Sequence, residues 1–215
     1  KRVNSDLSLP KKIFRHAKKL NLFENIEWVE GDVLEITSLM DGMIDCKEVI
    51  HAAAFVSFSP KETEEMYSIN VQGTENIVNA CLALNIQKLG YVSSVSTFNR
   101  EDEDTLVTEE NYWKSSSKNT NYGISKYLAE QEVWRGIQEG LNAVIINPSV
   151  ILGPGNWNNG SSQLFLKVWN GLKYYTSGGT AYVDVKDVSK SMIELMESTI
   201  INERFIISSE NIKYR

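Results

Sequence analysis

Short apolar runs alternate along this chain with longer segments whose apolar residues recur at helical spacing. Runs 48–51, 89–92 and 142–147 have the length and composition of buried strands, and segment 61–84 has the apolar face of a long helix. Parallel strands need crossover helices between them, so the alternation predicts an α/β fold with a doubly wound parallel sheet. The same patterns predict helices over 10–22, 34–45, 122–138 and 187–196, and strands over 26–29, 181–185 and 205–207, the last being the final strand.

The composition limits the kinds of partner. With 215 residues, 42% hydrophobic and 23% charged, the chain has the makeup of a soluble protein of one domain, or of one large and one partial domain. A net charge of −6 argues against nucleic acid as partner, and no apolar run approaches the ~20 residues of a membrane span. Cys46 and Cys81 are expected to be buried free thiols in a reducing, cytoplasmic compartment. His16 and His51 are too few for a histidine-rich metal site, and we expect no metal.

The stretch from Ser93 to Lys126 contains candidates for proton-transfer chemistry. Tyr122 and Lys126 are four residues apart and share one face of the predicted helix. A neighbouring ammonium lowers the pKa of a phenol from its usual value of about 10. Tyr122 is therefore a candidate general acid or base with Lys126 as its tuner, and Ser94, at a strand end, would hold the substrate oxygen. The alternative is an amphipathic helix with an exposed lysine, because this spacing also arises by chance.

Seven segments together resemble one enzyme family. They are 32–33, 51–54, 70–74, 91–94, 122–126, 147–149 and 182–188. In order and spacing they are similar to the extended short-chain dehydrogenase/reductase family, also called the NAD-dependent epimerase/dehydratase family, and the run 93–99 is most similar to the dihydroflavonol-4-reductase branch. The resemblance implies a Rossmann-like domain over 1–150. It also implies a partial, smaller substrate-binding region over 151–215, interleaved with the last strands of the sheet.

The resemblance assigns roles at the cofactor end of the sheet. The Asp32 carboxylate would accept from the adenine amino group and Val33 would pack on the ring; the alternative for Asp32 is the cap of a turn. The cofactor ribose and nicotinamide would lie over Ala52, Ala53 and Ala54, where small side chains let a ligand approach the backbone. His51 is expected to be a packing residue.

Further roles implied by the resemblance concern the catalytic end. Pro148 and Ser149 would meet the nicotinamide carboxamide, and Lys126 would also hold the nicotinamide ribose, beside Tyr122. Asn70 would support the catalytic strand through hydrogen bonds, which places it with Ser94, Tyr122 and Lys126 in the catalytic set; the alternative is an exposed surface asparagine.

The first part of the family's plan is absent from this sequence. That plan begins with a strand, a Gly-rich turn and a helix that hold the pyrophosphate, and no such turn occurs here. We therefore expect Lys1 to fall near the end of the family's second strand and the chain to belong to a longer enzyme; a natural protein without the phosphate loop is the alternative. Arg2 stands where NAD-preferring enzymes tend to have an acid, which favours NADP over NAD.

Two aromatic groups are candidates for substrate contacts. Tyr112 and Trp113 end a charged loop near the predicted active site. Segment 156–180 carries five aromatic residues, which are expected to form either a satellite core or an apolar binding wall. They are Trp157, Phe165, Trp169, Tyr174 and Tyr175.

Three functions are consistent with the sequence. The first is an oxidoreductase that moves a hydride between a nicotinamide cofactor and a carbonyl or hydroxyl group of a small molecule. The second is a nucleotide-sugar epimerase or dehydratase, although Val95 and Ser96 stand after Ser94 where dehydratases commonly need an acid. The third is a dinucleotide-binding sensor; such relatives often lose the Tyr/Lys pair that this chain keeps. The resemblance also allows a homodimer.

Overall fold

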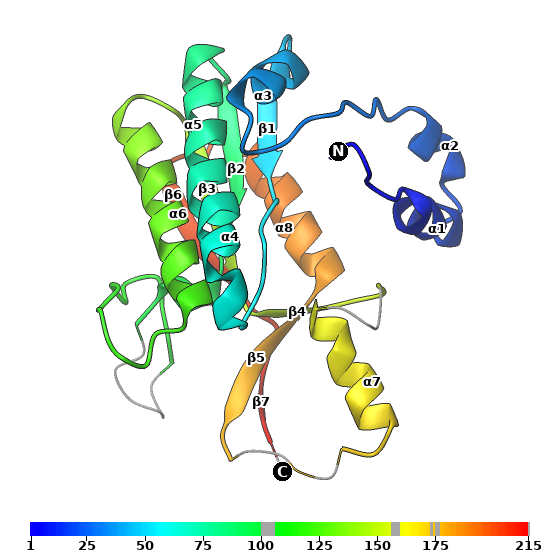
Figure 1. The fold of residues 1–215 in the computed structure, drawn as a ribbon, viewed down its shortest axis with the longest axis vertical. Helices are drawn as coiled ribbons and strands as arrows, with labels where there is room; N and C mark the ends of the chain where they lie inside the picture. The colour runs from blue at the N-terminus through cyan, green and yellow to red at the C-terminus, as the bar shows by residue number, and fades with distance from the viewer. Residues whose placement is uncertain (100–105, 156–159, 173, 175–176, 215) are drawn as a thin grey trace.

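A parallel sheet forms the centre of the molecule in the computed structural model, which describes residues 1–99, 106–155, 160–172, 174 and 177–214. Its four strands lie in the order β1, β2, β3, β6, and every neighbouring pair is parallel (Figure 1). The strands are β1 (Glu48–His51), β2 (Lys88–Val92), β3 (Ala143–Pro148) and β6 (Glu203–Ile207). The predicted α/β class is confirmed.

Helices cover both faces of this sheet. Inward-facing residues alternate along β3: Ala143 and Ile145 face one side, whereas Val144 and Ile146 face the other. The first side packs against α3 (Ile36–Met43), α5 (Gly73–Ala83) and α6 (Asn121–Gln138), and the second against α8 (Val185–Glu197). Both faces of the central strands β2 and β3 are therefore buried, as a doubly wound parallel sheet requires.

A smaller mixed sheet lies beyond the carboxyl ends of the parallel strands (Figure 1). It consists of β4 (Val150–Leu152), β5 (Gly179–Asp184) and β7 (Glu210–Lys213), with β4 parallel and β7 antiparallel to β5. Helix α7 (Gln163–Trp169) belongs to the same part of the chain. The prediction that 205–207 is the final strand was wrong: β7 follows it, and all its residues are exposed, so no apolar pattern marks it.

The N-terminal segment differs from the prediction in two ways. In place of one helix over 10–22 there are α1 (Ser8–His16) and α2 (Leu20–Glu24), separated where Lys18 takes a positive φ of 57°. Residues 26–29 do not form a strand. The Lys1 N–H group donates to the Val29 carbonyl (2.6 Å) and the Gly31 N–H donates to Lys1 (3.0 Å), but no ladder continues from this pair in the described residues.

The predicted long helix over 61–84 is interrupted. A 3₁₀ turn (Pro60–Glu62) and α4 (Thr63–Tyr67) lead into a π-helical turn, Ser68–Gln72, before α5 begins. The wider turn rotates Asn70 into the interior, where it is 1% exposed. Such insertions in a helix are frequent at functional sites. Across the described residues, no helix is long and apolar enough to cross a membrane.

The side chain of Lys88 caps the C-terminal end of helix α8. Its buried ammonium donates to the carbonyl oxygens of Leu195 (2.6 Å), Met196 (3.3 Å) and Ser198 (2.9 Å), which closes the C-terminal end of α8. We expect Lys88→Met to lower the free energy of unfolding by about 2–3 kcal/mol, since hydrogen bonds to a charged group are lost. Urea unfolding checks this. The control is Lys190→Met on the exposed side of α8, expected to change little; equal midpoints for the two variants would show that the cap is unimportant.

Candidate active site

A pocket of about 670 Å³ opens at the carboxyl end of β1 and brings the expected adenine and ribose contacts together. Arg2, Asp32 and Val33 line it from one side, and the exposed Ala52–Ala54 run lines it from the other. Lys1 also lines it, but its ammonium is paired with Glu30 at 2.5 Å. A pocket at this edge matches the place where open α/β sheets bind ligands.

Asp32 and Val33 are held in place by different contacts. The Asp32 carboxylate accepts from the Leu34 N–H (3.0 Å), so it does cap a turn while also facing the pocket. The backbone of Gly73 at the start of α5 packs directly on Val33: a Cβ added there would lie 2.8 Å from the Val33 Cγ2 atom. The glycine thus permits the close approach that fixes Val33.

Asn70 joins two segments of the site. Its amide oxygen accepts from the Phe55 N–H (2.7 Å), and its amide nitrogen donates to the Phe55 carbonyl (2.9 Å) and to Ser125 Oγ (3.0 Å). The alternative of an exposed asparagine was wrong. The expected support of the catalytic strand needs correction too, because these bonds reach the loop after β1 and helix α6, not β2.

Ser94 and Tyr122 meet at the carboxyl end of β2. Thr120 caps α6 by accepting from the Gly123 N–H (3.0 Å), which sets Tyr122 in the first turn of the helix. A Cβ on Gly123 would lie 3.3 Å from the Ser96 carbonyl oxygen, so the glycine lets α6 approach the segment after β2. Ser94 Oγ accepts from Ser96 Oγ (3.0 Å) and lies close enough to the Tyr122 hydroxyl to act on its pKa. Burial raises the pKa of Tyr122 above its usual value, and the Ser94 hydroxyl opposes this shift.

The Lys126 ammonium is hydrogen-bonded to Tyr91 rather than to Tyr122, its expected partner. The ammonium donates to the Tyr91 hydroxyl (2.8 Å) and to the Val92 carbonyl (3.0 Å), and the residue is 2% exposed. Burial lowers the pKa of Lys126 to about 7, opposed by the negative charge of Glu130. The predicted lowering of the Tyr122 pKa by Lys126 was therefore wrong for this arrangement, since burial sets the direction of that shift. The alternative of an exposed lysine was wrong as well.

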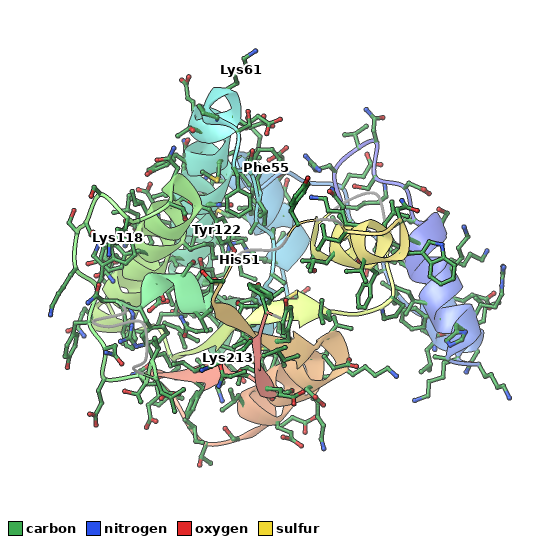
Figure 2. All side chains as sticks on the ribbon, turned by 90° about the horizontal axis from the view of Figure 1, so that it is seen from below. His51, Phe55, Lys61, Lys118, Tyr122 and Lys213 are labelled. Atoms are coloured by element: carbon green, nitrogen blue, oxygen red, sulfur yellow. The ribbon has the colours of Figure 1, made fainter. Side chains whose placement is uncertain are left out.

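His51 is a packing residue, as predicted. Its Nε2 atom lies 3.0 Å from Thr74 Oγ1 and its ring lies 5.5 Å from that of Tyr91. Burial lowers its pKa to about 3, with the Lys126 charge acting in the same direction. The imidazole is thus neutral. Figure 2 shows His51 and Tyr122 near the middle of the molecule, whereas Lys61 and Lys118 extend from its edge.

The end of β3 carries a buried hydroxyl that lacks a partner. Ser149 follows Pro148, and its N–H donates to the Ile207 carbonyl (3.0 Å), but its Oγ makes no hydrogen bond within the part of the chain that the structure describes. Buried polar groups normally have partners. An unpaired hydroxyl here fits a ligand with a polar group, such as the carboxamide of a nicotinamide ring.

Tyr122 lines a smaller hollow of about 300 Å³. Hydroxyl and amide side chains line most of it, and the Phe58 ring lies 6.2 Å from that of Tyr122. The remaining lining residues are Ser57, Ser59, Thr63, Asn119, Thr120 and Asn121. This lining suits an uncharged polar ligand.

The aromatic residues expected near the substrate lie elsewhere. Trp113 stacks on Tyr127 of α6 (4.5 Å, 8°), and Tyr112 is exposed; neither lines the hollow beside Tyr122. Trp169 and Tyr174 are 83% and 87% exposed, which contradicts a satellite core at these two positions. Trp157 and Tyr175 lie outside the described residues. Cys46, predicted to be buried, is exposed because it stands in the turn after α3, whereas Cys81 is buried as expected.

Glu130 and Arg204 were not predicted from the sequence. Glu130 on α6 is 1% exposed and pairs with Arg204 of β6 at 3.2 Å. A signal for Glu130 was present, because it lies four residues after Lys126 on the same helical face. Arg204 lies 74 residues further along the chain, and no local pattern points to it.

Comparison with known proteins identifies the family of this chain. Residues 7–207 match the NAD dependent epimerase/dehydratase family, and the chain therefore belongs to that family.

Named relatives and solved structures agree with this membership. The chain is 32% identical to cinnamoyl-CoA reductase 1 of Petunia hybrida and 31% identical to a putative dihydroflavonol 4-reductase of Synechocystis, over 89% and 87% of its length. It spans only 60% and 56% of those two proteins. The crystal structure of gox2253 superposes with a TM-score of 0.83 at 31% identity, covering 99% of this chain and 62% of that one. A Thermus thermophilus UDP-glucose 4-epimerase solved with NAD, 19% identical over 88% of this chain and 66% of its own, has a TM-score of 0.73 and shares the fold.

Proposed function

We propose that this chain forms the cofactor-binding and catalytic part of an NAD(P)-dependent reductase similar to dihydroflavonol 4-reductase. It would move a hydride between the nicotinamide cofactor and a carbonyl or hydroxyl group of a small molecule. The observation that carries the proposal is the closeness of the Ser94 and Tyr122 hydroxyls at the carboxyl end of β2. The names of the two relatives with about one-third identity support a reductase.

The chain's own residues suit a dinucleotide. The exposed alanines after β1 leave room for it, and Asp32 and Val33 lie across the same pocket. Ser149 offers its unpaired hydroxyl at the end of β3. When bound, the nicotinamide cofactor supplies the hydride.

Tyr122 and Ser94 handle the charge that develops when a carbonyl is reduced. As the substrate oxygen becomes negative it needs a proton, and Tyr122 holds one at neutral pH because burial raises the pKa of its phenol. The Ser94 hydroxyl donates to the same oxygen and stabilises its charge. Lys126, one turn after Tyr122 on α6, would bind the hydroxyls of the nicotinamide ribose.

Two other functions have less support. An acid commonly needed by dehydratases is absent at Val95 and Ser96. A dinucleotide-binding sensor that catalyses no reaction would not need a proton donor beside a second hydroxyl, as Tyr122 stands beside Ser94.

Consumption of the reduced cofactor tests the proposal. Full-length protein containing this sequence is mixed with NADPH or NADH and either a dihydroflavonol or a cinnamoyl-CoA thioester. We expect one of them to be reduced with equimolar loss of the cofactor. Interconversion of a nucleotide sugar, supplied in place of these substrates, without net cofactor loss would indicate an epimerase, and cofactor binding without turnover of any substrate would indicate a sensor; both outcomes contradict the proposal.

Arg2 predicts which cofactor is preferred. Its side chain is exposed at the pocket, whereas the neighbouring Lys1 is paired with Glu30. A guanidinium binds a phosphate through two hydrogen bonds. We expect NADPH to bind more tightly than NADH, and Arg2→Ala to weaken NADPH binding roughly tenfold or more, the worth of a charged hydrogen bond.

Isothermal titration of both cofactors against the full-length protein checks this preference. Lys11→Ala, which removes an exposed cation from α1 outside the pocket, is the matched control and should leave both affinities unchanged. Tighter binding of NADH that is unaffected by Arg2→Ala would show the prediction to be wrong.

A further inference from the structure

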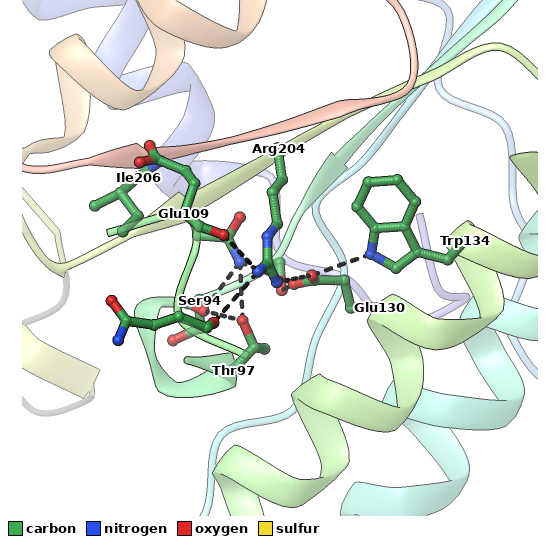
Figure 3. A network of polar contacts seen from close by, with 10 residues as sticks. Ser94, Thr97, Glu109, Glu130, Trp134, Arg204 and Ile206 are labelled. Atoms are coloured by element: carbon green, nitrogen blue, oxygen red, sulfur yellow. Dashed lines mark hydrogen bonds and ion pairs between the residues drawn. The ribbon is translucent and has the colours of Figure 1, made fainter. Parts of the chain in front are cut away.

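A buried carboxylate lies directly behind the Ser94 and Tyr122 pair. Glu130 is on α6, one turn after Lys126, and its Oε2 atom accepts from Ser93 Oγ (2.6 Å) and Asn147 Nδ2 (2.8 Å) (Figure 3). Ser93 is the residue before Ser94, and Asn147 is the second-last residue of β3, before Pro148. One oxygen atom thus ties α6 to the ends of both β2 and β3.

The second oxygen of Glu130 faces the opposite direction. Its Oε1 atom accepts from Trp134 Nε1 (3.3 Å) and from Arg204 Nη1 (3.2 Å). Arg204 is itself fixed, because its guanidinium lies 4.2 Å from the centre of the Phe98 ring and donates to the Glu109 carbonyl (2.7 Å). The ion pair therefore connects α6 with β6 and with the loop that contains Glu109 (Figure 3).

Asn147 extends the network to Ser94. Its amide nitrogen also donates to the Ser94 carbonyl (3.2 Å) and to Thr97 Oγ1 (3.0 Å), while Thr97 Oγ1 donates to the same Ser94 carbonyl (2.9 Å). The backbone of Ser94 is therefore held through residues that Glu130 orders. A buried ion pair is weak evidence for stability, since an apolar cluster of similar volume is often as stable. The Glu130–Arg204 ion pair lies next to Ser94, so a role in the active site explains its presence better than a role in stability.

We propose that Glu130, paired with Arg204, is a positioning residue of the active site, which holds the ends of β2 and β3 against α6 so that Ser94 and Tyr122 stay aligned. The proposal rests on the function proposed above. Glu130 touches neither substrate nor cofactor; it acts through Ser93 and Asn147.

The charge of Glu130 also acts on Lys126. The titratable groups that bear on the Lys126 ammonium are Tyr91 from β2, the neutral His51 from β1, and Glu130 from α6. Glu130 is the anion among them that opposes the effect of burial on the Lys126 pKa. Without this carboxylate burial acts alone, and Lys126 is expected to lose its proton at a lower pH.

Glu130→Gln in the full-length protein tests the proposal. In either orientation the amide N–H group of glutamine faces a donor, either Asn147 Nδ2 or the N–H groups of Trp134 and Arg204, and the ion pair with Arg204 is lost. At saturating cofactor and substrate we expect the rate of hydride transfer to fall roughly 10²-fold, as a small misplacement of reacting groups does. In the protein without cofactor, the lysine Cε signal of Lys126, assigned by its loss in Lys126→Met, should titrate about one pH unit lower than in the wild type.

Glu132→Gln on the same helix is the matched control. Glu132 pairs with Arg135 at 2.8 Å near the surface and should change neither readout. If Glu130→Gln does not fold, Ser93→Ala keeps the ion pair and removes only the bond to β2, and a rate lowered about tenfold is expected. A wild-type rate with an unshifted titration in Glu130→Gln would overturn the proposal, as would a wild-type rate in Ser93→Ala. A wild-type protein that binds cofactor but never transfers hydride would contradict the proposed function. The titration of the Lys126 signal in Glu130→Gln would then still test the effect of Glu130 on Lys126.

Discussion

Tyr122→Phe is expected to slow carbonyl reduction by roughly 10²–10⁴-fold, the usual worth of general acid–base catalysis. The phenol is the proposed proton donor next to Ser94, and phenylalanine keeps the ring that lies 6.2 Å from Phe58 while removing the hydroxyl. Cofactor affinity should stay near that of the wild type, because the hydroxyl meets the substrate oxygen. Turnover and cofactor binding, measured on variants shown to be folded, check this.

Tyr127→Phe is the matched control for Tyr122→Phe. Tyr127 lies on the same helix, but its ring stacks on Trp113, away from Ser94. We expect wild-type turnover for it. If both tyrosine variants reduced the substrate at the wild-type rate, Tyr122 would have no role as a proton donor.

Lys126→Met is expected to lower both turnover and cofactor affinity, by about tenfold or more in each, since the proposed donor to the ribose is lost. Tyr122→Phe, in contrast, is expected to lower turnover alone and to leave cofactor affinity unchanged. Binding of NADPH by titration and turnover at saturating cofactor separate the two losses. A Lys126→Met protein with normal cofactor affinity would contradict the role at the ribose.

The same variant gives a pH signature in stability. Burial lowers the pKa of Lys126 to about 7 from its ordinary value of 10.5. Between these two pH values the unfolded chain binds more protons at this residue than the folded protein does, so the contribution of Lys126 to stability rises with pH across this window. We expect the free energy of unfolding of the wild type, relative to Lys126→Met, to rise from pH 7 to pH 10. A constant difference would show that the amine is not buried in this way.

Helix α6 shows what the sequence could predict. Its range and its end before Gly140 were predicted from local signals, and the structure gives Thr120 as the cap and a positive φ of 104° at Gly140. Strands β1 and β2 were also found, because both are short runs with strand-forming residues between helical segments. The meeting of Ser94 and Tyr122 followed from placing one at a strand end and the other in the first turn of the next helix.

Contacts that depend on distant residues could not be predicted. The partner of Lys126 is Tyr91, and a buried strand with residues facing both ways does not reveal which tyrosine a lysine will meet. The pair of Glu130 and Arg204 needs β6 beside β3, which only the sheet order establishes. The π-helical turn at Asn70 changes which face of the helix is buried, and no residue pattern marked it.

Transfer of a labelled hydride tests the central claim most directly. Reduced cofactor deuterated on the transferred position of the nicotinamide ring is mixed in a single turnover with the full-length protein and a carbonyl substrate. The product is then analysed by mass spectrometry and NMR. The account predicts one deuterium on the former carbonyl carbon of the product, formed far more slowly by Tyr122→Phe. Product without deuterium at that carbon, or a wild-type rate in Tyr122→Phe, would contradict it.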